Sequence, residues 1–298
     1  MRHAQFCPIF GESKKIELRA KGVIDDNLNG EYSTNFRGRG IDFHDLREYI
    51  HGDEVRSIDW NTTARTGEPY VKQFVEQREL NIYIAIDVSR SSNYGSILQS
   101  RHDLAALIFS IIALSASKNG DKIGLILYTN KIEHFTEPKK GKGHAMSLLR
   151  EVLSHEIISN VSSPGKVLRF ILGRQKRRSM IFLISDFLCP SFKQELKICS
   201  FKHDLIALQT LDPAELEFPS IGKVYLKNPE DNNSYLINTS NKTIRDTYLL
   251  KRNNWQRNLE ADFKINNVDH VKFVNDENCD PSIALRTFFK NRLKSRRH

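Results

Sequence analysis

The sequence predicts an α/β fold with a doubly wound, mostly parallel sheet and a β-rich module at the N-terminus. From residue 82 onward, short apolar runs alternate with helical stretches, which is the pattern of βαβ units. The first run, residues 82–86, is apolar throughout, as expected for a parallel strand that is covered on both faces. Residues 1–80 instead mix glycine with closely spaced acidic and basic residues. We therefore expect an N-terminal module over 1–80 and an α/β domain over 81–298.

The N-terminal module is predicted to contain short strands and a hairpin. A turn signal at residues 67–69 separates β-branched and aromatic residues at 62–63 and 70–71, which favours two paired strands. One helical turn is expected over residues 46–50.

The α/β domain begins with a strand and a capped helix. Ser100 with Asp103 three residues later predicts the start of that helix, and Gly120 predicts its end. The strands expected are residues 82–86, 123–127, 180–184, 205–208 and 271–274. The helices expected are residues 100–118, 145–153, 166–172, 194–200, 248–263 and 282–293. Two segments break the alternation: an antiparallel edge strand is expected at 132–135, and a β-hairpin insertion at about 213–240.

The composition is that of a globular protein, with 298 residues of which 39% are hydrophobic and 27% are charged. It excludes disordered, fibrous and small disulfide-stapled classes. The longest nearly apolar stretch, 104–116, is shorter than the roughly 20 residues that cross a bilayer, and no apolar signal-peptide core is present. The four cysteines form no C-x-x-C pair, which argues against a zinc site. We expect a cytoplasmic protein without a membrane span.

Basic residues exceed acidic residues by 45 to 36, and much of the surplus lies in residues 174–178 and 290–297. Such clusters can contact phosphate or acidic lipids, but cations are also common at solvated helix ends. Aromatic residues that could stack on bases are not interleaved within 290–297. Nucleic-acid binding is therefore the less favoured interpretation.

The sharpest chemical signal follows the first buried strand of the α/β domain. Asp87, Ser89 and Ser91 lie on one tight turn, and a later strand ends in Ser185 and Asp186. Ligands of open α/β sheets bind at the carboxyl ends of strands, and oxygen ligands favour Mg²⁺, Mn²⁺ or Ca²⁺. We expect Asp87, Ser89, Ser91 and Asp186 to bind Mg²⁺. The alternative is that both aspartates only cap helix starts.

The spacing D-x-S-x-S with a distant Asp resembles the metal-ion-dependent adhesion site of von Willebrand factor type A domains. Over nearly the whole chain the sequence also resembles the bacterial family called domain of unknown function fifty-eight. The motifs that carry this second resemblance lie at residues 38–40, 42–43, 46–49, 52–53, 56, 58–60, 63–65, from 71 onward, 120–124, 185–187, 203–204 and 212–215.

The resemblance implies a type A domain with an N-terminal module. In adhesion sites the middle loop usually supplies a Thr. The matching stretch here, 162–165, has none, and Ser163 is the expected replacement. Members of the family are often encoded beside MoxR-type AAA+ ATPases and are thought to act as their adaptors or co-chaperones. The resemblance therefore implies a MoxR-type ATPase and an unknown protein client as partners, with a partner carboxylate bound to the metal.

The N-terminal module holds a dense set of opposite charges around one tryptophan. This set is either a partner-binding surface with Trp60 as an anchor or an ion-pair network that fastens the module to the sheet. Its members are Arg47, Asp53, Arg56, Asp59, Trp60 and Arg65.

The sequence argues against an enzyme. It contains no P-loop, no H-E-x-x-H and no G-x-S-x-G motif. The alternative function is a metal-dependent phosphoesterase or nuclease at the same sheet edge. Such hydrolases add carboxylates or a His to activate water, and the sequence near Asp87 and Asp186 offers none.

Overall fold

The computed structural model describes residues 42–75, 80–93, 95, 100–156, 161–217, 219–227, 234–276 and 280–295. The expectations for residues 1–41 lie outside these ranges. None of the helices within them combines the length and apolar character that a membrane span requires.

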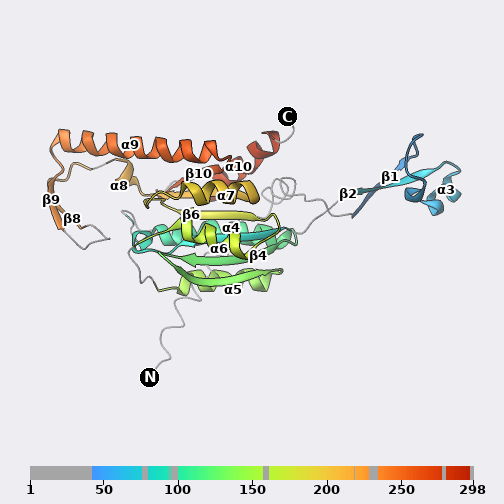
Figure 1. Cartoon of the computed structure of the whole chain (residues 1–298), viewed down its shortest axis with the longest axis horizontal. Coiled ribbons are helices and arrows are strands. Elements are labelled where there is room, and N and C mark those ends of the chain that lie inside the picture. The colour runs from blue at the N-terminus through green and yellow to red at the C-terminus, as the bar shows by residue number, and fades with distance from the viewer. Residues whose placement is uncertain are drawn as a thin grey trace, which may run out of the picture.

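Residues 42–75 form a small unit around one antiparallel pair of strands (Figure 1). The strands are β1 (Asp42–Glu48) and β2 (Tyr70–Val75), and between them lie the short helices η1 (Val55–Ser57) and α3 (Trp60–Thr66). The predicted helical turn over 46–50 is wrong, because residues 46–48 are extended and pair with β2.

A strand around residues 62–63 is also a wrong prediction, since these residues lie in α3. The side chain of Asp59 begins this helix by accepting the N–H groups of Asn61 at 3.0 Å and Thr62 at 3.3 Å. Gly67 ends it with a φ of 82°, the left-handed conformation that glycine adopts at helix ends. These two end signals outweigh the β-preference of the threonines between them.

The largest sheet among the described residues after residue 80 is six-stranded, in the order β10-β7-β6-β3-β4-β5. All neighbouring strands run parallel except β5, which pairs antiparallel with β4 at the edge. The fold class and the antiparallel edge strand are confirmed. The strands are β3 (Asn81–Asp87), β4 (Lys122–Tyr128), β5 (Ile132–Lys139), β6 (Met180–Ser185), β7 (Asp204–Leu211) and β10 (Asp269–Val274).

Two layers of helices cover this sheet (Figure 1). Helices α4, α5 and α10 share one core with alternate residues of β3 such as Ile84, while α6, α7 and α9 share the other with residues such as Ala85. Because successive strand residues point to opposite faces, both faces of β3 must be apolar. The helices are α4 (Arg101–Lys118), α5 (Lys142–Ser154), α6 (Pro164–Arg174), α7 (Lys193–Lys202), α9 (Lys242–Ile265) and α10 (Pro281–Ser295), and a short 3₁₀ helix, η2 (Arg90–Asn93), follows β3.

Between β7 and α9 the chain forms a short helix, α8 (Pro213–Leu216), and a separate antiparallel hairpin of β8 (Lys223–Lys227) and β9 (Ser234–Asn238). Asp212 begins α8 by accepting the N–H of Ala214 at 2.9 Å. This short helix positions Glu215, which contacts the candidate site.

Candidate functional site

The strand order reverses direction between β3 and β6. From β3 the chain moves to β4 and β5 on one side, and it then returns to β6, β7 and β10 on the other. Such a switch point leaves a crevice at the carboxyl ends of the two central strands, where open α/β sheets bind ligands. Asp87 ends β3 and Ser185 ends β6, and Ile86 is the register partner of Ile184. The aspartates predicted from sequence therefore lie at the same edge, on neighbouring strands.

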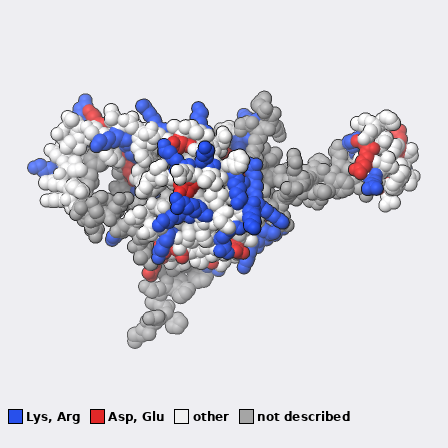
Figure 2. Space-filling view, in the orientation of Figure 1, with Lys and Arg blue, Asp and Glu red and all other residues white. Residues whose placement is uncertain are grey.

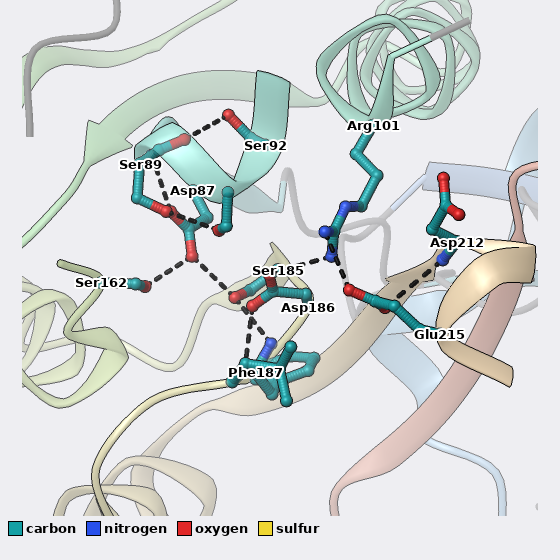
Figure 3. A network of polar contacts seen from close by, with 12 residues as sticks. Asp87, Ser89, Ser92, Arg101, Ser162, Ser185, Asp186, Phe187, Asp212 and Glu215 are labelled. Atoms are coloured by element: carbon teal, nitrogen blue, oxygen red, sulfur yellow. Dashed lines mark hydrogen bonds and ion pairs between the residues drawn. The ribbon is translucent and has the colours of Figure 1, made fainter. Parts of the chain in front are cut away.

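Asp87 has a buried carboxylate held by three donors (Figure 3). Its Oδ2 accepts the hydroxyl of Ser162 at 2.5 Å and that of Ser185 at 2.8 Å. Its Oδ1 accepts the N–H of Ser89 at 2.9 Å. Among the residues that the structure describes, no Lys or Arg forms an ion pair with Asp87. Its negative charge is therefore met by dipoles alone.

The electrostatics of this carboxylate favour a nearby cation. Burial raises the pKa of Asp87, and the negative charge of Asp186 raises it further, while the hydrogen bonds from Ser162 and Ser89 lower it. A raised pKa means that the ionised form is disfavoured at this position. A cation bound next to Asp87 would offset both unfavourable effects.

Ser89 and Ser91 lie on the loop that leads into η2. Their Oγ atoms are 3.0 Å apart, and the hydroxyl of Ser92 donates to the Ser89 carbonyl at 2.6 Å. Because one hydroxyl proton serves the pair, both oxygens keep lone pairs available to a ligand. The predicted turn thus presents two hydroxyl oxygens next to Asp87.

In the middle loop the structure brings Ser162, rather than the expected Ser163, to Asp87. Ser163 is the residue before the first turn of α6, and its N–H donates to the Thr129 carbonyl at 3.0 Å. Pro164 begins the helix directly after it. The sequence spacing could not decide between the two adjacent serines, because the backbone direction before a proline sets which hydroxyl faces the site.

Asp186 is held by the loop after β6. Its Oδ1 accepts the N–H of Leu188 at 2.9 Å, and the Ser185 hydroxyl accepts the N–H of Phe187 at 3.0 Å. Phe187 has a φ of 60°, which is rare for a residue with a large side chain. Strained residues of this kind are concentrated at functional sites.

Sequence reasoning missed two residues of the site, Arg101 and Glu215. The Arg101 side chain is 4% exposed, and its guanidinium donates to Asp186 Oδ2 at 3.0 Å and lies 2.9 Å from Glu215 Oε1. A signal was present in the sequence, because a positive charge in the first turn of a helix opposes the helix dipole. Such an arginine needs carboxylate partners, and Asp186 and Glu215 supply them (Figure 3).

Positive charge at the site is concentrated beside Asp186 and Glu215. Arg101 contacts both of these carboxylates, and Arg252 also acts on Glu215. Burial raises the pKa of Glu215, whereas the positive charges of Arg101 and Arg252 lower it. Asp87 is therefore the carboxylate of the site whose charge an added cation would compensate most directly.

The site encloses a cavity of about 10 Å³, lined by residues that include Asp87, Ser91, Arg101, Ser185 and Asp186. This volume is close to that of one water-sized sphere, so the space suits a single small ion. The described residues contain no group of three His, Cys, Asp or Glu side chains placed to bind a metal. Any ion here would therefore depend on hydroxyl oxygens as well as on carboxylates.

The charged set of the N-terminal module is only partly brought together. Arg47 and Asp53 form a bidentate pair with N–O distances of 2.6 and 2.7 Å, and the Arg47 hydrogen bonds hold the pKa of Asp53 below its usual value. Asp59 is the cap of α3 described above. Arg56, Trp60 and Arg65 are exposed, Trp60 by 64%. The Arg47–Asp53 pair thus lies within the module, where it braces the end of β1.

The sheet order, with this site at its switch point, defines a von Willebrand factor A-like fold. Over residues 45–258 the sequence matches the family described as "Protein of unknown function DUF58", and the chain belongs to this family. It is 30% identical over 220 residues to Uncharacterized protein Rv1480 of Mycobacterium tuberculosis and, to the same extent, to Uncharacterized protein Mb1516 of Mycobacterium bovis. Each match covers 73% of this chain and 69% of the relative.

Two solved structures are also similar to this chain. The conserved hypothetical protein BatB from Bacteroides thetaiotaomicron is 16% identical, with a TM-score of 0.45 and coverage of 72% of this chain and 99% of that one. A von Willebrand factor type A protein from Catenulispora acidiphila is 12% identical, with a TM-score of 0.38 and coverage of 74% and 43% respectively.

Proposed function

We propose that this chain is a protein-interaction module that binds a carboxylate of its partner through a divalent cation, preferably Mg²⁺, at the β3–β6 switch point. One observation carries the proposal: the Asp87 carboxylate is buried beside Asp186 without an ion pair to any described residue. Burying an uncompensated charge is costly. A bound cation would compensate this charge, which gives a functional reason for burying it.

The residues present fit a small oxygen-binding ion. Asp87 would supply most of the negative charge, because Arg101 already binds Asp186 Oδ2 at 3.0 Å. The hydroxyls of Ser89, Ser91 and Ser162 would supply neutral oxygen ligands. Mg²⁺ binds oxygen ligands and commonly retains water. With few charged ligands, the ion would keep enough positive charge to attract a carboxylate from another protein.

The partner expected from the family resemblance is a MoxR-type AAA+ ATPase. In this proposal the ATPase or its client presents an acidic residue to the ion. The chain would then act as an adaptor between the two.

Titration calorimetry with MgCl₂ and MnCl₂ tests the ion site. We expect saturable heats from the wild-type chain and none from Asp87→Ala. Ser162→Ala and Ser163→Ala form a matched pair: the first should weaken binding, and the second should leave it unchanged. Equal heats from the wild type and Asp87→Ala would refute the proposal.

A metal-dependent phosphoesterase or nuclease needs a further base to activate water. The structure does bring a third carboxylate, Glu215, near the site, but Arg101 binds it at 2.9 Å. This contact favours a binding role over hydrolysis. Manganese-dependent turnover of a generic phosphodiester, lost in Asp87→Ala, would reverse the preference.

A further inference from the structure

A groove of about 810 Å³ lies at the opposite end of the sheet from the candidate metal site. It is formed where β6 and β7 begin and where α7 and α9 end. The lining residues that matter here are Arg178, Lys197, Ile198, Phe201, His203 and Ile265. None of them takes part in the function proposed above.

The groove carries large apolar side chains that face water. Phe201 is 93% exposed, Ile265 is 77% exposed and Ile198 is 58% exposed. Ile198 and Phe201 are three residues apart on α7 and so share one helix face, while Leu196 and Cys199 fill the buried face. Single exposed apolar residues are ordinary, but several around one groove indicate an interaction site.

The same groove is positively charged. Arg178 and Lys197 line it, and Figure 2 shows Lys and Arg side chains gathered at the end of the sheet where α7 ends. Among the described residues that line the groove, Asp204 is the single carboxylate, and Arg292 pairs with it. The local charge is therefore unbalanced in favour of cations.

His203, which also lines the groove, is affected by the positive charge there. Burial lowers its pKa to about 4, and the positive charges of Lys202 and Arg178 add to this effect. Its Nδ1 accepts the N–H of Ser179 at 3.3 Å, so the proton lies on Nε2. That Nε2–H has no hydrogen-bond partner among the described residues.

We propose that this groove binds an acidic, amphipathic segment of a partner protein. Its carboxylates would face Arg178 and Lys197, and its apolar side chains would pack on Ile198, Phe201 and Ile265. A concave site suits a peptide better than it suits a flat lipid surface. Because the groove and the metal site lie at opposite ends of the sheet, both can be occupied at once, and the chain can connect two proteins.

Fluorescence anisotropy with the full chain tests the groove. The probe is a short labelled peptide with Glu and Leu or Phe at helical spacing, measured in the presence of EDTA so that the metal site does not contribute. We expect saturable binding that falls by about tenfold or more in Phe201→Ser and in Arg178→Glu, the loss typical of a central contact. Leu250→Ser and Lys251→Glu, at exposed positions elsewhere on α9, are the matched controls and should bind as the wild type does.

Three outcomes would overturn the proposal. The first is the absence of saturable binding, and the second is equal binding of the same peptide with Lys in place of Glu. The third is sedimentation with phosphatidylserine vesicles that is stronger than peptide binding and is lost in Phe201→Ser, which would assign the groove to a membrane surface. Calcium, magnesium and manganese are absent from both assays, so the results do not depend on the metal site and do not test it.

Discussion

Replacing Asp87 by Asn should separate the stability of the fold from metal binding. The side chain keeps its size. The Asn oxygen can still accept the N–H of Ser89, and the Asn amide can pair with Ser162 and Ser185 because serine hydroxyls both donate and accept. What is lost is one buried negative charge beside Asp186. Without metal, we therefore expect Asp87→Asn to be more stable than the wild type.

The magnitude follows from the burial of the group. Asp87 is 5% exposed, and removing an uncompensated buried charge should raise the free energy of unfolding by about 1 kcal/mol. For a domain of this size that is an increase in Tm of about 2–4 °C. Saturating Mg²⁺, at roughly 100 times its Kd, should stabilise the wild type by about 2.7 kcal/mol. Mg²⁺ should not change the free energy of unfolding of Asp87→Asn.

Differential scanning fluorimetry in EDTA and in MgCl₂ measures both effects. The order of the two melting temperatures should reverse when Mg²⁺ is added. The reasoning is refuted if Asp87→Asn is the less stable protein in EDTA and Mg²⁺ shifts both proteins equally, because Asp87 would then be a purely structural hydrogen-bond acceptor.

The pH dependence gives a second readout of the same group. The native state binds the Asp87 proton more tightly than an ordinary Asp with a pKa of 3.8 does. Stability without metal should therefore fall as the pH rises from about 3.8 through the raised pKa, a slope that Asp87→Asn lacks. Mg²⁺ affinity should change in the opposite sense and increase over the same range, since the ion needs the ionised carboxylate.

Three further predictions concern other parts of the α/β domain. Arg101→Gln should lower the free energy of unfolding in EDTA by about 3–5 kcal/mol, because it leaves the buried Asp186 without the cation that pairs with it. Mg²⁺ should restore part of the loss in chemical denaturation, and a loss that Mg²⁺ does not change would contradict the shared site. Acid should destabilise the fold between pH 6.5 and about 4. Burial lowers the pKa of His203 and His270 to about 4, so the unfolded chain binds protons at a higher pH than the native state does. Urea titrations in which the free energy of unfolding does not change over this pH range would contradict the prediction. Gly124→Ala should lower the free energy of unfolding by about 1–3 kcal/mol, because a Cβ there would lie 2.8 Å from the Thr136 carbonyl oxygen. Gly143→Ala is the control: the position is in open space on a helix, so the same urea titration should show an unchanged or higher free energy of unfolding.

Most of the sheet could be predicted because its strands are buried on both faces. Residues 82–86 and 180–184 are continuous apolar runs, which are typical of strands in a parallel sheet that is covered on both faces. The same argument located Asp87 and Asp186, since the carboxyl ends of parallel neighbours must meet at one edge. These predictions depend only on chain direction and hydrophobic pattern.

The remaining errors concern features that depend on short-range geometry. Helix α3 was missed because its threonines favour strands, while its stability depends on the Asp59 cap and on Gly67. Ser162 and Ser163 are equivalent in spacing, and only the backbone before Pro164 distinguishes them. The place of Arg101 in the first turn of a helix indicates that it needs a carboxylate partner, but no local pattern identifies that partner as Asp186, which is 85 residues away in the sequence.

The two ends of the sheet differ in charge for a reason that is built into the fold. In a parallel α/β sheet the covering helices begin at the carboxyl edge and end at the amino edge, so the helix dipoles place partial positive charge at the first and partial negative charge at the second. Lysines at the ends of α7 and α9, Lys202 and Lys264, are therefore favourable to the fold itself. This dipole effect explains Lys202 and Lys264, neither of which lines the groove, but it does not explain Arg178 or Lys197, which do. It does not explain Phe201 and Ile265 either, because helix dipoles give no advantage to apolar side chains in water.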